Sequence, residues 1–201
     1  RASDDLIETY TEKLIHVGKK IIKGRLEYLR LYTPLIKEFY YRLGMNNQSL
    51  ILRYQPFGYH LDNEGGIHME KGFEMVKEEE REREITIIGP HRDEIVFEKN
   101  GREFRTFGSQ GEKKSLALSI KLAEMSVIQL IKKSKVIMIF DDVFSELDQS
   151  HQDLLLEEIL NQGQVFISTT QENDDWARKR KNRVTVLNVE KGKIIMGKCN
   201  E

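Results

Sequence analysis

One segment constrains the fold of this chain more than any other, and it runs from Val136 to Asp148 with the sequence VIMIFDDVFSELD. Its five apolar residues predict a strand that is buried on both faces, and two consecutive carboxylates, Asp141 and Asp142, follow the carboxyl end of that strand. In open α/β sheets ligands bind at this edge, where a carboxylate can hold a hard cation through water. A solvated acidic loop after a core strand explains the same pair, and taken alone the pair favours this simpler interpretation.

The segments around this strand alternate between strand and helix patterns. The predicted elements are a hairpin turning on Asn100-Gly101, a long amphipathic helix after Gly111, the strand Val136–Phe140, a helix over 149–160, a strand Val165–Ser168 and a final hairpin turning on Lys191-Gly192. Strands that alternate with helices and are closed by an antiparallel edge predict an α/β layered domain. We place this domain at residues 85–201.

Residues 1–84 predict a helical arm with a short strand region over 50–54. Thr33 followed by Pro34 resembles an N-cap with a first-turn proline, so we expect the first helix to kink or restart there and to stop at Gly44. A coiled-coil arm and an amphipathic helix packed on a globular core both fit its spacing near 3.5 residues. That spacing occurs in a first register of Ile7, Tyr10, Leu14, Val17 and Ile21, and in a second register of Ile22, Leu26, Leu29, Thr33, Ile36, Tyr40 and Leu43.

The segment FGSQGEKK, residues 107–114, lies immediately before the long amphipathic helix. The hydroxyl of Ser109, the amide of Gly111 and the helix N-terminus together can cradle an anion. A glycine-containing turn with an ordinary helix cap explains the same residues. The segment is not a phosphate-binding P-loop, because that motif needs Gly-Lys-Ser/Thr in succession and here Glu112 and a second lysine intervene.

Composition excludes several classes of protein. The chain has 201 residues, a formal net charge of −1 and one cysteine, Cys199, so it is not an intrachain disulfide scaffold. No apolar run approaches the ~20 residues that span a bilayer, and the first ten residues lack a signal core. We therefore expect a cytoplasmic protein without a membrane segment. The balanced charge neither supports nor excludes nucleic acid binding.

The motifs together resemble those of an ATP-binding-cassette ATPase: a serine-glycine helix start is followed by an apolar strand ending in two acids and then by Ser-Glu-Leu-Asp. Within that class, GPHRDE at 89–94 and RTFGSQGEKKSLALSIKLAE at 105–124 resemble the RecF family of bacterial recombination mediators. The resemblance is strongest over residues 85–170, and RecF proteins also interrupt their head with a helical insertion. It implies the C-terminal lobe of an ATPase head like those of Rad50 and the chromosome-maintenance proteins, with a helical arm subdomain.

The resemblance also implies roles for particular residues. Asp141 matches the Walker B acid that orients Mg²⁺ through water, and Asp142 takes the place of the usual catalytic glutamate. Thr169 occupies the switch position, where most cassette ATPases have histidine. Four residues match the signature motif, which contacts the γ-phosphate of ATP held on the opposite subunit: Ser109, Gln110, Gly111 and Glu112. Four residues match the D-loop, which crosses the dimer interface: Ser145, Glu146, Leu147 and Asp148.

The function implied by the resemblance is an ATP-dependent DNA-binding clamp that recognises gapped or junction DNA. Its cofactors are ATP and Mg²⁺, and its partners are DNA, a second copy in an ATP-dependent homodimer, and RecR and RecO, with which it helps load the recombinase. No GxxxxGK[ST] loop occurs in the 201 residues, so we expect a weak DNA-dependent ATPase only in the full-length protein. The densest basic run, which we consider for DNA contact, is Arg178, Lys179, Arg180 and Lys181.

Two other functions stay open. A Toprim-type metal-dependent nuclease attached to a cassette head also uses strand-end acids, although it needs an acid-x-acid pair and Asp141-Asp142 is contiguous. A non-catalytic dimerisation scaffold needs neither acid. For the segment Gly89–Glu94 we expect either that it lines the site or that it ties the strand to the base of the arm.

Overall fold

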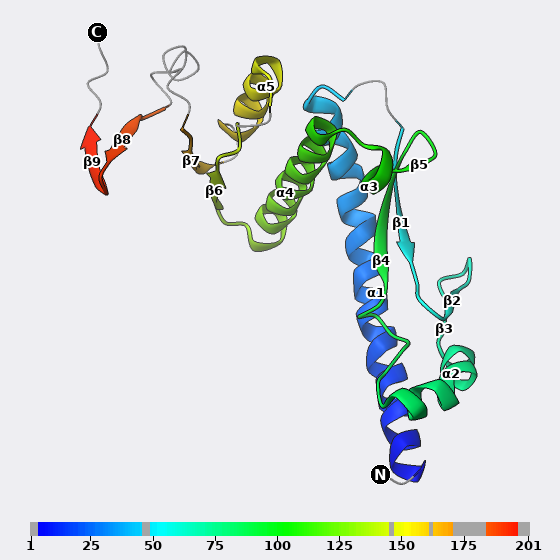
Figure 1. The fold of residues 1–201 in the computed structure, drawn as a ribbon. Helices are drawn as coiled ribbons and strands as arrows, with labels where there is room; N and C mark the ends of the chain where they lie inside the picture. Colours follow the sequence, from blue (N-terminus) through cyan, green and yellow to red (C-terminus); the bar gives the residue numbers. More distant parts are fainter. Residues whose placement is uncertain (1–3, 46–48, 145–146, 161–162, 171–183, 197–201) are drawn as a thin grey trace.

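The computed structural model describes residues 4–45, 49–144, 147–160, 163–170 and 184–196, and shows an elongated α/β chain (Figure 1). The helices are α1 (Asp4–Arg42), α2 (Glu70–Arg83), α3 (Phe104–Phe107), α4 (Gln110–Lys132) and α5 (Gln149–Leu160). The strands are β1 (Leu50–Gln55), β2 (His60–Leu61), β3 (Ile67–His68), β4 (Glu94–Lys99), β5 (Arg102–Glu103), β6 (Ile137–Asp141), β7 (Gln164–Ser168), β8 (Leu187–Glu190) and β9 (Lys193–Met196).

The long helix α1 continues through Pro34, so the expected restart at this residue is wrong. Proline removes one helical hydrogen bond and costs about 3 kcal/mol in a helix interior. Burial of Ile36, Phe39 and Tyr40 in the main core just beyond the proline offsets that cost. The expected end at Gly44 is confirmed: Gly44 has φ +89°, and the amides of Gly44 and Met45 donate to the carbonyls of Tyr41 and Tyr40, which is a Schellman motif.

The two apolar registers of α1 have different fates. Four members of the second register are buried and the other three are half-buried; the buried ones are Ile22, Ile36, Tyr40 and Leu43. Four members of the first register face solvent, with Tyr10 59% and Val17 52% exposed. The helix therefore packs on the rest of the described chain through its second register, as an amphipathic helix on a core.

A three-stranded antiparallel sheet in the order β1-β4-β5 lies beside α1 (Figure 1). The register pairs Leu50 with Lys99 and Gln55 with Glu94. The hairpin at Asn100-Gly101 is confirmed, since both residues have positive φ, +50° and +76°, as a type I′ turn requires. The sheet therefore runs alongside α1 from the pair Gln55 and Glu94 to Lys99, which lies beside the start of α4.

The main core lies where the last turns of α1 meet α4 and α5. Helix α4 packs on α1, and its buried side chains share one cluster with side chains from β6 and α5. Buried side chains from both parts of the chain, such as Tyr40, Leu122 and Leu155, belong to this one cluster. The division near residue 84 stays a prediction, and the packing of α1 on α4 and the pairing of β1 with β4 both cross it.

The β6–β7 pair is parallel, which fits the α/β prediction, but two expectations about it are wrong. The first is burial on both faces: Ile137 is 61% and Ile139 79% exposed, because α4 and α5 contact only the other face. The second is closure by an antiparallel edge. Strands β8 and β9 form a hairpin on Lys191-Gly192 as predicted, but among the described residues they pair only with each other.

Candidate functional site

The start of α4 is held by a reciprocal pair of hydrogen bonds. The backbone amide of Glu112 donates to Ser109 Oγ at 3.3 Å, and the backbone amide of Ser109 donates to Glu112 Oε2 at 2.9 Å. This capping box satisfies two donors at the helix end and fixes the loop that precedes it. Ser109 and Gln110 are exposed, while Gly111 and Glu112 are half-buried. The four residues predicted to bind a phosphate thus form a capped helix start whose first two residues face solvent.

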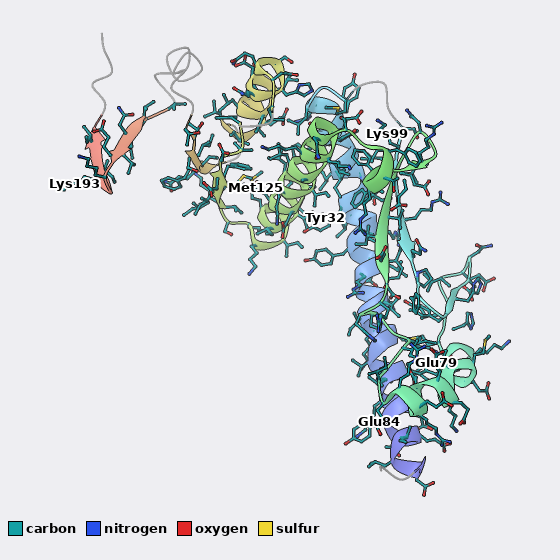
Figure 2. The ribbon with its side chains drawn as sticks, in the orientation of Figure 1. Tyr32, Glu79, Glu84, Lys99, Met125 and Lys193 are labelled. Atoms are coloured by element: carbon teal, nitrogen blue, oxygen red, sulfur yellow. The ribbon has the colours of Figure 1, made fainter. Side chains whose placement is uncertain are left out.

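A residue outside the predicted motif completes this arrangement. Lys99, labelled in Figure 2, is the last residue of β4. Its Nζ lies 2.7 and 2.8 Å from the two carboxylate oxygens of Glu112, and the side chains of Lys99 and Glu112 are 20% and 16% exposed. Burial and, secondarily, the charge of Glu112 raise the pKa of Tyr40 in α1. Glu112 therefore joins the helix start to β4 and lies close to the end of α1. Sequence reasoning missed Lys99, whose only signal is its place before the Asn100-Gly101 turn.

The two acids lie at the carboxyl end of β6, next to the end of β7. The Ser168 hydroxyl donates to Asp141 Oδ1, and the amide of Asp142 donates to the Ser168 carbonyl at 3.1 Å. Asp142 has φ +46°, so the chain turns sharply there, and both acids are exposed. Ser168 was also missed, although it directly precedes the predicted switch residue Thr169, which follows β7.

The segment that follows the two acids is held in place by burial and by hydrogen bonds from α5. Val143 and Phe144 are buried, and Gln152 Nε2 in α5 donates to the carbonyls of Phe144 and Leu147 at 3.2 and 2.9 Å. Amide side chains with no charge can satisfy two buried carbonyls without the desolvation cost of an ion. This anchoring fixes where the strand-end acids stand.

Of the predicted D-loop, Ser145 and Glu146 lie outside the described residues. Leu147 is buried in the main core. Asp148 caps α5: its Oδ1 accepts from the amide of His151 at 3.0 Å, from Ser150 Oγ at 2.7 Å and pairs with His151 Nδ1 at 2.8 Å. These hydrogen bonds hold the pKa of Asp148 well below its usual range.

The segment Gly89–Glu94 ties the sheet to the arm. Asp93 accepts hydrogen bonds from the hydroxyls of Tyr54 and Tyr59 and from the amide of Phe57. Burial, and then the hydrogen bond to Asp93, raise the pKa of both tyrosines. Arg25 of α1 donates to the carbonyl of Pro90. Of the two roles considered for this segment, these contacts favour the structural tie.

The charges of the described residues are unevenly distributed. A hollow of about 1100 Å³ between the start of α1 and α2 is lined by eight glutamates, and its basic lining residues are Lys77 and Arg81. This end of the arm is therefore acidic.

The basic run Arg178–Lys181 lies outside the described residues. The described ranges hold no group of three or more His, Cys, Asp or Glu side chains placed to bind a metal, and none of their helices could cross a membrane.

The arrangement fits Mg²⁺ and a nucleotide in one specific sense. Mg²⁺ keeps several waters and takes further ligands from substrate phosphates, so one exposed strand-end carboxylate, Asp141, is enough to hold it through water. The capped start of α4, with its partial positive charge, suits a phosphate. We call the capped start of α4 and the acid-bearing end of β6 the two edges of the site. They supply different halves of what a nucleotide site needs.

Comparison with known proteins gives a consistent result. The chain is 33% identical over 196 residues to the DNA replication and repair protein RecF of Halalkalibacterium halodurans, covering 96% of this chain and 53% of that protein. It is 37% identical over 202 residues to RecF of Geotalea daltonii, covering 97% and 54%. A RecF–ATP structure, of the recombination mediator protein in the RecFOR pathway, matches with TM-score 0.70 and 27% identity over 86% of this chain and 47% of that chain. No protein-family model matches.

The fold defines a class: the C-terminal lobe of a cassette-type ATPase head with a helical arm. Within that class the chain is a relative of RecF, as its motifs predicted. It spans about half the length of the curated relatives it matches, which is consistent with the C-terminal part of such a protein.

Proposed function

We propose that this chain forms half of the ATPase head, and the arm, of a recombination mediator that acts in DNA repair. The observation that carries the proposal is the pairing of a capped, outward-facing helix start with strand-end acids on a fold shared with a RecF–ATP structure. In this proposal ATP lies between two heads of a homodimer, and ATP binding closes the clamp on DNA. Gapped or junction DNA, RecR, RecO and help in recombinase loading belong to the same proposal, as does a cytoplasmic location.

Each edge has a distinct task. Ser109, Gln110, Gly111 and Glu112 form the helix start that would face the γ-phosphate of ATP bound on the partner head. The capping box uses the amides of Ser109 and Glu112, so the donors for the phosphate are the Ser109 hydroxyl and the amides of Gln110 and Gly111. Asp141 would hold Mg²⁺ through water, and the bound metal would neutralise phosphate charge. Phosphoryl transfer depends mostly on positioning and charge neutralisation, so dividing the donors between two subunits makes hydrolysis depend on dimerisation.

Asp142 is the proposed base that accepts a proton from the attacking water. Its turn geometry is set by its own amide, which donates to Ser168, and by the buried Phe144 two residues later. Aspartate is one methylene shorter than the usual glutamate, and Thr169 stands in place of histidine, so we propose slow turnover. Asp148 extends the proposed interface, together with Ser145 and Glu146, while Leu147 anchors the proposed D-loop in the main core.

DNA contact is proposed away from the tip of the arm. The glutamate-lined hollow between α1 and α2 repels phosphate, whereas three lysines at and just beyond the end of α4 are exposed: Lys132, Lys133 and Lys135. The run Arg178, Lys179, Arg180 and Lys181 has the same sign. Such clusters neutralise backbone phosphates, so DNA affinity is expected to fall as salt rises.

The experiment is ATP hydrolysis by the complete protein carrying Asp142→Asn, with Glu190→Gln on β8 as the control carboxylate. Loss of a general base lowers turnover by about 100-fold or more, and the control is expected to keep the wild-type rate. Unchanged turnover in Asp142→Asn would contradict the assignment of Asp142 as the general base.

Two further measurements bear on the proposal. This chain alone is expected to hydrolyse no ATP. A Mg²⁺-dependent nicking activity would favour the Toprim alternative instead.

A further inference from the structure

Glu112 presents an electrostatic problem for the proposed phosphate contact. A carboxylate at the third position of a helix stabilises the helix start, since it interacts with the same positive helix end that would attract a phosphate. An uncompensated carboxylate there repels the phosphate it stands beside. Something must neutralise Glu112 if α4 is to bind the γ-phosphate.

Lys99 has the geometry to do this. Its ammonium bonds both carboxylate oxygens of Glu112, and one of these oxygens also accepts the amide of Ser109. The pair is mostly buried, so it is less screened than a surface ion pair. The type I′ turn at 100–101 and the pairing of Lys99 with Leu50 in β1 fix the backbone that carries the ammonium.

Another ion pair on α4 shows what is particular about Lys99. Lys121 and Glu124 lie 2.9 Å apart on the same helix, but their side chains are 67% and 43% exposed and both come from α4 itself. Lys99 instead comes from the sheet, whose preceding segment is tied to α1 by the hydrogen bond from Arg25 to the carbonyl of Pro90. Its charge is therefore delivered to the helix start by a different structural element.

We infer that Lys99 is a positioning residue for ATP binding: it neutralises Glu112 and holds the Ser109–Glu112 helix start in a form that accepts a phosphate from the partner head. This rests on the proposed function. Lys99 acts through Glu112, and the inference is that the two substitutions have opposite signs. Removing the lysine weakens ATP binding, and removing the carboxylate strengthens it.

The test is the KM for ATP of the complete protein. Lys99→Met is expected to raise KM roughly five-fold, the effect of one charge at a helix N-terminus. Lys99→Arg is expected to stay near wild type, Glu112→Gln to lower KM, and the double variant Lys99→Met/Glu112→Gln to return to within about two-fold of wild type. Lys121→Met is the matched control and is expected to leave KM unchanged.

A merely structural pair gives a different pattern. In that case Lys99→Met and Glu112→Gln both lower the melting temperature, and KM either stays constant or is not restored in the double variant; either result overturns the inference. If Lys99→Met does not fold, Glu112→Gln alone decides, because a raised or unchanged KM contradicts the opposite-sign prediction.

Two further variants separate failure of this inference from failure of the proposed function. If Asp142→Asn and Ser109→Ala leave ATP hydrolysis unchanged, the proposed function fails. If they impair hydrolysis while Lys99→Met has no effect on KM, the inference alone fails.

Discussion

The two edges of the proposed site are built in different ways. The start of α4 is held by polar contacts within four residues and by one lysine from β4, and it is complete within the described chain. The end of β6 is held by apolar anchors, Val143 and Phe144, on one face, while the other face of the strand is open to solvent. One edge is specified by local hydrogen bonds and the other by burial.

The difference determines what each edge tolerates. A polar cap contributes about 1 kcal/mol and can be lost without unfolding a domain, whereas a buried aromatic anchor contributes several kcal/mol. The acids at the end of β6 should therefore depend on the core for their position. The geometry of the start of α4 should depend on charge balance more than on packing.

The largest effect is expected from Phe144→Ala. Phe144 is fully buried beside α5, and removing a buried phenylalanine side chain costs about 3 to 5 kcal/mol because a cavity remains. Urea unfolding of this chain measures the loss, with the exposed Phe107→Ala as the control, expected within about 0.5 kcal/mol of wild type. A loss below 1 kcal/mol for Phe144→Ala would show that burial does not specify this edge.

A smaller effect is expected from Ser109→Ala, which removes the side-chain half of the capping box. The expected loss is about 1 kcal/mol. Ser126→Ala is the matched control, since the Ser126 hydroxyl donates to a carbonyl within the same helix, that of Leu122 at 3.1 Å. Equal losses in the two variants, measured by urea unfolding, would mean that the cap contributes nothing beyond an ordinary serine hydrogen bond.

The same contrast explains what could be predicted from the sequence. The helix start at Ser109, the type I′ turn at Asn100-Gly101 and the Gly44 stop were all predictable, because each is specified by a few adjacent residues. The continuation of α1 through Pro34 was not, because tertiary burial of Ile36 and its neighbours overrides a local signal.

Long-range contacts account for the remaining differences. Lys99 is 13 residues from Glu112 and Ser168 is 27 from Asp141, and neither pairing leaves a pattern in the sequence. The apolar run Val136–Phe140 predicted a strand correctly but not its exposure. Apolar composition reports what a strand prefers to contact, and the described chain supplies contacts for one face only.

The smallest effect is expected from Ile139→Thr on that open face. Ile139 is 79% exposed, and threonine keeps the β-branched shape that suits a strand, so the free energy of unfolding of this chain should change by less than about 0.5 kcal/mol. Phe140→Ala, on the neighbouring buried position, is the contrasting variant and is expected to lose at least 3 kcal/mol. If Ile139→Thr instead costs more than 1 kcal/mol, and the cost grows with protein concentration, then a second copy covers this face in solution. The two edges would then both be complete, one through a lysine of its own chain and the other through a neighbouring molecule.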